Sequence, residues 1–383
     1  MRPWIAHLGP NLVSASVRRR YSGSYRATLV PFIADRALSL RSPVIALAAE
    51  ASAEIARFDA ELGAEVAPFA SVLLRSESAS SSMIENLTSG ARSIALAELG
   101  SREKRNATEI VGNVAAMTAA LELAQRLDAD AILAMHAALV GELYPEIAGR
   151  WREEQVWIGG TSFGPHQAAF IPPHHEHVPA LIDDLVAFMN RDDLPMMAQA
   201  AVAHAQFETI HPFPDGNGRT GRALVHSMLR GHGLTQNVTV PVSAGLLINT
   251  AAYFASLTAY RDGDPSAIVE RLAAAVFEAT TNGRQLVRDL RALRRAWDET
   301  VNARRDSGAW RVADLLLRQP VIDAAAVARE LGIEPRNAQR AIAPLAEVGV
   351  LNECTGFKRN RMWQAREVLT ALDDFAARAG RRR

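Results

Sequence analysis

The chain has 383 residues, 49% of them hydrophobic and 22% charged, and a formal net charge of zero. These values are ordinary for a soluble globular protein of two or three domains, so bulk charge points to no particular partner. The single cysteine, Cys354, excludes an intrachain disulfide and fits a reducing compartment. No stretch approaches the ~20 apolar residues of a membrane span, and residues 1–20 lack the apolar run of a secretory signal. We therefore expect a cytoplasmic protein with no membrane partner.

Residues 1–36 mix Arg, Pro and Gly with little periodicity, which predicts an irregular start. Beyond them, apolar residues recur at helical spacing through most of the chain, which predicts a mainly α protein. The helix near position 80 follows a serine-rich stretch, and serine is a common N-cap. The expected helices cover about 43–62, 65–75, 80–90, 91–126, 129–140, 179–190, 195–210 and 219–231, and long helical segments continue from Pro241 to about Arg304.

Two parts of the chain break this helical pattern. At about 156–171, apolar and aromatic runs flank a turn rich in Gly and Pro, which predicts a β-hairpin. At 308–383, a helix, a helix-turn-helix, a basic strand-turn-strand and a final amphipathic helix predict a winged helix-turn-helix domain.

The winged helix is the candidate for contact with an anionic partner. From Asn302 onward the chain carries 15 Lys or Arg against 10 Asp or Glu, so the rest of the chain is net negative. The expected recognition helix and wing expose side chains that suit base edges and phosphates. They are Arg336, Asn337, Gln339, Arg340, Lys358, Arg359 and Arg361. Winged helices also contact proteins, so DNA contact, protein contact and a homodimer all stay open.

The stretch HPFPDGNGRTGR, which begins at His211, combines the groups that attack on a phosphate needs. His211 follows the apolar end of a helix and can accept a proton near neutral pH. Asp215 is a hard oxygen ligand that suits Mg²⁺. The Gly216–Gly218 turn can aim backbone N–H groups at an anion, and the N-terminus of the next helix adds more. Arg219 and Arg222 lie on one face of that helix and suit phosphate oxygens.

This stretch resembles the signature of the Fic family, a histidine, a phenylalanine, an acid, Gly-Asn-Gly and two arginines at these spacings. The matching residues are His211, Phe213, Asp215, Gly216, Asn217, Gly218, Arg219 and Arg222. The resemblance covers about 40–290 and implies a Fic-type helical core with ATP as cosubstrate. We expect Phe213 to anchor the loop in the core.

The resemblance implies a protein adenylyltransferase, which moves AMP from ATP to a Ser, Thr or Tyr hydroxyl of a target protein. His211 would deprotonate that hydroxyl, its oxygen would attack the α-phosphorus, and pyrophosphate would leave. Asp215 would hold Mg²⁺ against the phosphates, and Arg219 would neutralise the leaving group. Gly216–Gly218, with Asn217, would cradle the phosphates. Another diphosphate donor, or removal of AMP by the same site, stays open.

The residues SSMIEN at 81–86 suggest a brake on this chemistry. Ser81 and Glu85 share one face of a helix, which alone is typical of a capped surface helix. Fic members with an inhibitory helix show Ser/Thr-x-x-x-Glu-Gly/Asn, and Ser81, Glu85 and Asn86 match it. The resemblance implies that Glu85 pairs with Arg222 and fills the space of the γ-phosphate.

Three other features bear on the site. The predicted hairpin resembles the Fic flap, which aligns a target protein segment by main-chain pairing. Tyr253, on the helix after the catalytic one, would face the adenine or pack in the core. The run His174, His175, Glu176 and His177 lacks the spacing of a metal site, and adjacent side chains diverge in an extended chain, so we expect a solvated turn.

The expected organisation has four parts. They are an N-terminal helical region at 1–95 with the inhibitory helix at about 80–90, a Fic core at 96–290, a helical linker at 291–307 and the winged helix at 308–383. Two functions remain: a protein adenylyltransferase, and a DNA-binding regulator whose Fic core senses nucleotide with little catalysis. The intact histidine, acid and arginines favour the first.

Overall fold

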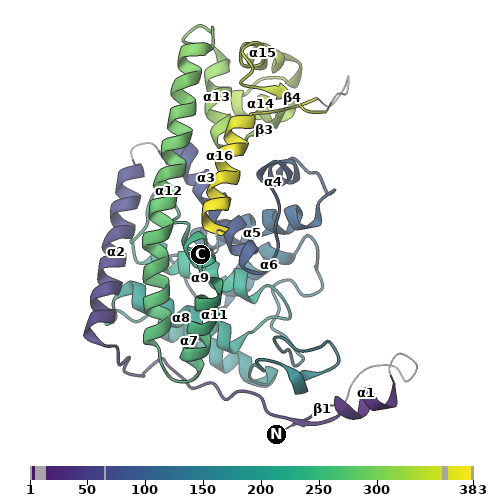
Figure 1. The fold of residues 1–383 in the computed structure, drawn as a ribbon, viewed down its shortest axis with the longest axis vertical. Helices are drawn as coiled ribbons and strands as arrows, with labels where there is room; N and C mark the ends of the chain where they lie inside the picture. Colours follow the sequence, from purple (N-terminus) through teal and green to yellow (C-terminus); the bar gives the residue numbers. More distant parts are fainter. Residues whose placement is uncertain (1, 5–13, 64–65, 356–360, 381–383) are drawn as a thin grey trace.

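The computed structural model describes residues 2–4, 14–63, 66–355 and 361–380, and it is mainly helical, as the sequence predicts (Figure 1). The strands form two small antiparallel sheets, one at the N-terminus and one near the C-terminus. The helices between them build the core that carries the site.

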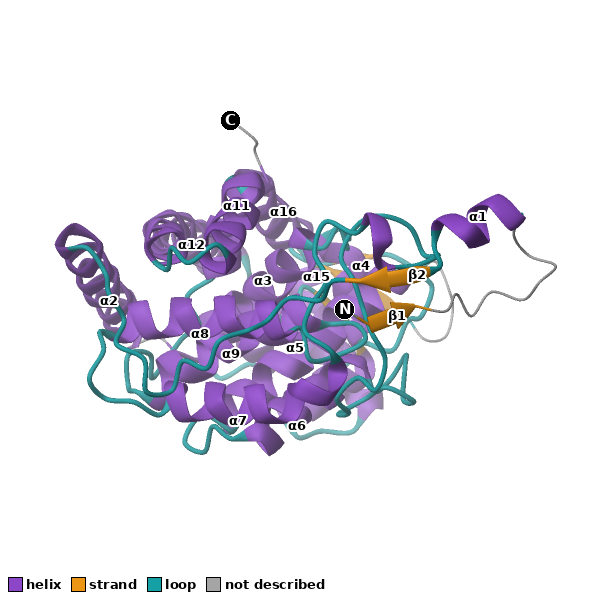
Figure 2. Cartoon of the chain, turned by 90° about the horizontal axis from the view of Figure 1, so that it is seen from below, coloured by secondary structure: helices purple, strands orange, loops and turns teal. Residues whose placement is uncertain are grey.

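The N-terminal segment is more ordered than its composition predicts. Strand β1 (Arg2–Trp4) pairs antiparallel with β2 (Gly23–Tyr25), and the short helix α1 (Ala15–Arg20) lies between them in the sequence. The next residues, 26–41, form an extended strap that runs beneath the helices (Figure 2). Backbone N–H groups of the strap bond to the core: Ile33 donates to Asp184 at 2.6 Å. The prediction of an irregular start is therefore wrong for β1, α1 and β2.

Two long helices follow the strap. The first, α2 (Ser42–Gly63), agrees with the prediction, but α3 (Val66–Ile84) is continuous where the sequence predicted a break between 75 and 80. The serines bond back along the helix and do not cap a new one: Ser78 Oγ donates to the Leu74 carbonyl at 2.9 Å, and Ser82 Oγ donates to that of Ser78 at 2.9 Å.

The predicted helix over 91–126 is two helices, α4 (Ala91–Glu98) and α5 (Arg105–Glu122). The break falls at Gly100, whose φ of 95° is a conformation that an α-helix does not contain. The prediction of one helix there is wrong because the apolar spacing continues across the turn. Helix α6 (Ala129–Val140) is confirmed.

The centre of the molecule is a set of closely packed helices. Helix α7 (Val178–Met189) packs on α8 (Met196–Ile210), and α8 packs on α9 (Asn217–Gly231). Every residue of α8 from Met197 to Ile210 is buried, as in a helix surrounded by protein on all sides. The loop between α8 and α9 is therefore held by two core helices.

The next helices complete the core. They are α10 (Val242–Ile248), α11 (Thr250–Arg261) and α12 (Ser266–Thr300). Helix α12 packs on α2, α8, α10 and α11 and runs to residue 300, so most of the predicted linker 291–307 is the end of this helix. Among the described residues no single helix is long and apolar enough to cross a membrane, and only the bent pair α10–α11 passes that test jointly.

The predicted C-terminal elements come in the predicted order, and the strand β3 (Val321–Asp323), which the sequence did not predict, lies between the first two helices. The C-terminal elements are α13 (Gly308–Arg318), β3, α14 (Ala324–Leu331), α15 (Gln339–Glu347), β4 (Asn352–Glu353), β5 (Met362–Gln364) and α16 (Arg366–Gly380). Strand β5 lies between β3 and β4 and pairs antiparallel with both. Helix α13 packs on α3, and α16 packs on α3 and α12, so this region docks on the core. Lys358 and Arg359 of the predicted wing lie outside the described residues, and the assignment as a winged helix stays a prediction.

Candidate active site

The α8–α9 loop is fixed by two left-handed residues. His211 ends α8 with φ 51° and donates its backbone N–H to the Phe207 carbonyl at 2.8 Å. Gly216, with φ 78°, begins the entry into α9, and a Cβ there would lie 2.9 Å from a Leu139 methyl group. Both the conformation and the lack of space therefore require glycine at 216.

Phe213 anchors the loop, as expected. Its side chain is fully buried and stacks on His136, with ring centroids 3.7 Å apart and an interplanar angle of 4°. Trp151 stacks on the same ring at 5.0 Å. The loop is thus attached to α6 and to the segment that precedes the flap.

Asn217 has a different role from the one expected. Its side-chain oxygen accepts from the Phe213 N–H, and its amide nitrogen donates to the Phe213 carbonyl, both at 2.8 Å. Because the side-chain amide closes the loop in this way, it does not face the phosphate cradle. Any phosphate contact from this residue has to come from its backbone.

His211 is poised to act as a base. Its side chain keeps 17% exposure, and burial, followed by the nearby charge of Arg152, lowers its pKa to about 4. The imidazole is therefore neutral at pH 7 and able to accept a proton. Its Nδ1 has no hydrogen-bond partner among the described residues and lies 3.9 Å from the carboxylate of Glu208.

Sequence reasoning missed Glu208, one turn before His211. It is buried, and burial raises its pKa to about 7 although Arg222 acts in the opposite direction. Only one sequence feature could have indicated Glu208, namely that it is an isolated carboxylate among apolar neighbours on a helix.

Asp215 presents a carboxylate at the mouth of the loop. Its side chain is 57% exposed, and one oxygen lies 3.5 Å from the Arg219 guanidinium. A single exposed carboxylate beside an anion-binding turn fits Mg²⁺, which binds through one or two carboxylates together with phosphates.

Glu85 bridges the two arginines of the loop helix. Its Oε1 accepts from Arg222 at 2.7 Å, and its Oε2 lies 3.0 Å from Arg219 Nε. Both arginine side chains are almost wholly buried, at 4% and 3% exposure. Although burial disfavours the Arg222 charge, the Glu85 carboxylate raises the pKa of Arg222 above its ordinary value. The pairing of Glu85 with Arg222 is thus present, and Arg219 joins it.

Ser81 holds the same guanidinium from the preceding turn of α3. Its hydroxyl accepts from Arg222 Nε at 2.8 Å, and its carbonyl accepts from Arg222 at 2.9 Å. Asn86, with φ 63°, ends α3 in the left-handed conformation that asparagine and glycine tolerate best. The Glu-Gly/Asn pattern therefore has a structural reason, because the chain must turn directly after the carboxylate.

The Glu85 carboxylate also fills the glycine turn. A Cβ added at Gly218 would collide with Glu85 Oε1 and would lie 2.9 Å from an Arg222 nitrogen. The protein's own anion thus sits where the backbone and the two arginines would receive a phosphate.

Tyr253 does not face a ligand site. It is 1% exposed, and its hydroxyl lies 2.7 Å from His204 Nε2, so the core alternative holds and the adenine assignment is corrected. The neighbouring Phe254 is 52% exposed.

The flap is a looped hairpin with less strand than predicted. Isolated bridges join Ile158 to Phe170 and Thr161 to Gly164 in place of two continuous strands. The consecutive glycines after Ile158 explain this, because Gly159 and Gly160 both have φ near 75°. One side of the flap contacts the strap, since the Thr28 N–H donates to the Ile171 carbonyl at 3.0 Å.

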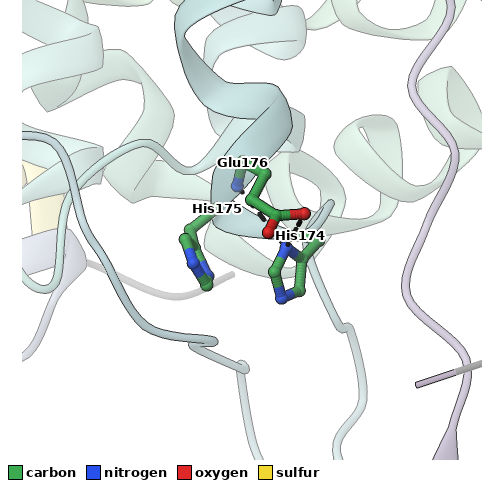
Figure 3. Close-up of side chains that lie close together, drawn as sticks. All are labelled: His174, His175 and Glu176. Atoms are coloured by element: carbon green, nitrogen blue, oxygen red, sulfur yellow. Dashed lines mark hydrogen bonds and ion pairs between the residues drawn. The ribbon is translucent and has the colours of Figure 1, made fainter.

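The histidine run at the end of the flap is a compact turn (Figure 3). A short 3-10 turn, η2 (His175–His177), winds the chain so that ligand atoms of His174, His175 and Glu176 lie within 4.8 Å of one another. The expectation of diverging side chains is wrong because it assumed an extended chain. His174 and His175 are half-buried and His177 is exposed, and His174 Nδ1 lies 3.3 Å from Glu176 Oε2.

A separate cavity of about 210 Å³ lies between the strap and helices α8 and α11. Its lining includes Thr209, Tyr260 and Arg261 but no residue of the 211–222 loop. This cavity is therefore separate from the glycine turn, where the Glu85 carboxylate lies.

Fold and loop together define a helical domain built around an anion-binding turn with a neutral histidine at its entrance. Residues 126–229 match the Fic/DOC family, and this part of the chain is a Fic domain. Ser81 and Glu85 lie outside the matched residues.

Curated relatives are similar to part of the chain. Protein adenylyltransferase Fic-1 of Caenorhabditis elegans is 33% identical over 147 residues, 38% of this chain and 26% of that protein. A probable protein adenylyltransferase of Aquifex aeolicus (strain VF5) is 35% identical over 105 residues, 24% of this chain and 32% of that protein. The chain thus spans about a quarter to a third of these relatives.

A solved structure shares the fold over most of the chain. The crystal structure of a Fic family protein from Desulfovibrio desulfuricans G20 superposes with a TM-score of 0.54 at 22% identity. The superposition covers 86% of this chain and 97% of that one.

Proposed function

We propose that the protein is a protein adenylyltransferase whose Glu85 holds the phosphate cradle closed. The observation that carries this proposal is the contact of one carboxylate with both loop arginines at the glycine turn. The match of residues 126–229 to the Fic/DOC family and the similarity of part of the chain to named adenylyltransferases support the chemistry.

His211 begins the transfer in this proposal. The neutral imidazole accepts the proton of a target hydroxyl, the hydroxyl oxygen bonds to the α-phosphorus, and the bond from that phosphorus to the pyrophosphate oxygen breaks. Arg219 would neutralise the charge that builds on pyrophosphate. Mg²⁺ held by Asp215 would supply further charge neutralisation at the phosphates.

The exposed ring of Phe254 is the aromatic we assign to the adenine side, in place of Tyr253. The target protein would pair with the flap along 158–161, because the strap already bonds to the other side at Ile171. Ile158, 37% exposed, offers an apolar contact there.

The test compares wild type with Glu85→Gly, incubated with Mg²⁺ and ATP labelled at either the α- or the γ-phosphate. Incorporation of α-label but not γ-label, rising at least about tenfold in Glu85→Gly, is expected because opening the cradle admits the productive phosphate pose. Glu98→Gly is the matched control, since Glu98 also ends a helix and pairs with an arginine, Arg75. Equal, low labelling of wild type and Glu85→Gly would remove the proposal.

A second function rests on the exposed surface formed by the short 3-10 turn η3 (Pro335–Asn337) and the start of α15. Arg336, Asn337, Gln339 and Arg340 are all exposed, as base or phosphate contacts need. The alternative of a nucleotide-sensing DNA-binding regulator predicts retention on DNA that falls with salt, with no α-label in Glu85→Gly. Retention lost in Arg336→Ala and Arg340→Ala would assign it to this face, and retention unaffected by both would exclude it.

A further inference from the structure

Arg152 links the catalytic loop to the base of the flap. Arg152 follows Trp151 in the chain and is 3% exposed. Its backbone N–H donates to the Pro212 carbonyl at 2.9 Å, and its Nε donates to the His211 carbonyl at 2.8 Å. The arginine therefore grips two consecutive residues at the start of the loop.

The rest of the guanidinium reaches both ends of the flap. One terminal nitrogen donates to the Glu154 carbonyl at 3.1 Å, and the other donates to the carbonyls of Pro173 and, at 3.4 Å, Ile210. Residues 154 and 173 flank the predicted flap, 156–171. One rigid fork thus joins the two flap ends to the loop that carries His211.

The charge of Arg152 is held by carbonyl dipoles. Among the described residues no carboxylate forms an ion pair with it, and burial lowers its pKa to about 10, so it stays charged at neutral pH. A buried charge of this kind is costly unless its hydrogen bonds are satisfied. Here they are satisfied only while the loop and both flap ends keep their relative positions.

We propose that Arg152 is a positioning residue that sets the flap, and hence a bound target segment, relative to the His211 imidazole. This inference rests on the proposed function, because it assigns Arg152 a part in bringing the target hydroxyl to the base. Arg152 itself touches neither phosphate nor hydroxyl in this arrangement.

Arg152 also acts on His211 through its charge, which gives a readout that loss of structure alone does not move. Burial is the main cause of the low His211 pKa and the Arg152 charge the next, while Arg261 acts in the same direction. The Glu208 backbone and the Asp215 carboxylate act in the opposite direction. Removing the Arg152 charge raises the pKa of His211 toward its ordinary value of 6.5.

The experiment uses the full chain with Glu85→Gly as the parent and adds Arg152→Met or Arg152→Lys. Arg271→Met is the matched control, because Arg271 is also largely buried and donates to a backbone carbonyl, that of Gly245. AMP incorporation is measured against ATP concentration and against pH from 5 to 8.

Arg152→Met is expected to lower kcat by roughly tenfold to a hundredfold with the KM for ATP within about twofold, because misplacement of reactants affects the chemical step. Because burial and Arg261 still lower the His211 pKa in this variant, its rate should begin to fall at a higher pH than that of the parent, whose His211 pKa is about 4. Arg152→Lys keeps the charge, so it should retain the parent's pH profile yet lose rate, because one ammonium cannot span the His211 and Pro173 carbonyls. Unchanged kcat in both variants, or a loss in Arg152→Met with the parent's pH profile, would overturn the proposal.

Hydrogen exchange separates failure of this inference from failure of the proposed function. If the parent incorporates no AMP, adenylyl transfer is wrong, yet Arg152→Lys should still speed amide exchange in 154–173 and in 211–216 together. Faster exchange in only one of these segments, or in neither, would show that Arg152 does not couple them. The same measurement on Arg152→Lys decides the question if Arg152→Met does not fold.

Discussion

At the scale of single residues, the site depends on a histidine that stays neutral. His211 ends a buried helix in a left-handed conformation, so its ring is presented by the backbone and shielded by the protein. Burial lowers its pKa to about 4, which keeps the base form present throughout the neutral range. His211→Ala in the Glu85→Gly background should therefore abolish AMP incorporation at every pH.

The same pKa predicts the pH profile of transfer. The neutral form is needed, so the rate of Glu85→Gly should fall only as pH approaches 4 and should be constant between pH 6 and 8 as far as His211 is concerned. Initial rates of α-label incorporation across this range provide the measurement. A half-maximal rate near pH 6.5 would mean that the imidazole is hydrated in solution and the prediction is wrong.

Glu208 predicts a pH dependence of stability. The pKa of Glu208 is 4.5 in the unfolded chain and about 7 in the folded protein. The protonated carboxyl group therefore makes its full contribution to the free energy of unfolding below pH 4.5, and this contribution is lost as the pH rises through 7. Glu208→Gln removes this loss, and the variant should gain relative to wild type by up to about 3 kcal/mol between pH 4 and 8. Urea unfolding at both pH values measures it, with exposed Glu347→Gln as control. A difference between Glu208→Gln and wild type that is the same at both pH values would contradict the assignment.

The residues of the 211–222 loop could be located from the sequence, because the groups that make up the site lie within twelve consecutive positions. His211, Asp215 and the arginines meet at one turn, and Glu85 reaches it from 137 positions away, as the resemblance implied. Arg152 and Glu208 could not be predicted, because their partners are backbone carbonyls and distant side chains. For Tyr253 the sequence left the adenine and core alternatives open, because periodicity does not tell which of two adjacent aromatics faces the core.

At the scale of elements, the end of α3 determines where Glu85 lies. The helix continues through the serine-rich stretch because hydroxyls bond back to preceding carbonyls, a pattern that sequence alone does not distinguish from capping. The flap and the break at Gly100 were misjudged for a related reason, since positive φ values at glycine become visible only in the fold.

Asn86 gives this element a direct test. Asn86→Ala places a residue with a Cβ at φ 63° and should lower the free energy of unfolding by about 1 kcal/mol. Asn86→Gly, which tolerates the same φ, should change it by only a few tenths of a kcal/mol and serves as the control. Thermal or denaturant unfolding of both variants measures the difference. Equal destabilisation by alanine and glycine would show that the side chain, and not the backbone conformation, matters at this position.

At the scale of the whole molecule, the proposed function makes Glu85 and a nucleotide compete for the side chains of Arg219 and Arg222. A ligand stabilises a protein by an amount set by the ligand concentration relative to Kd. Competition between Glu85 and the nucleotide should therefore change the rise in unfolding temperature that the nucleotide causes. Wild type should gain less stability from ATP and Mg²⁺ than Glu85→Gly, for which a concentration of 100 times Kd corresponds to about 2.7 kcal/mol. Differential scanning of both proteins with and without nucleotide measures this. Identical gains would show that the carboxylate leaves phosphate binding untouched.

The length of helix α12 affects how the C-terminal region is placed relative to the α8–α9 loop. The helix is 35 residues long, roughly 50 Å, and it packs on α8 of the core and on α13 and α16 of the C-terminal region. A continuous helix of this kind keeps its two ends at a fixed separation. A macromolecule bound to the C-terminal region would therefore be kept at a set distance and direction from the α8–α9 loop. The choice among its hydroxyls would then depend on this distance and direction as well as on pairing along the flap.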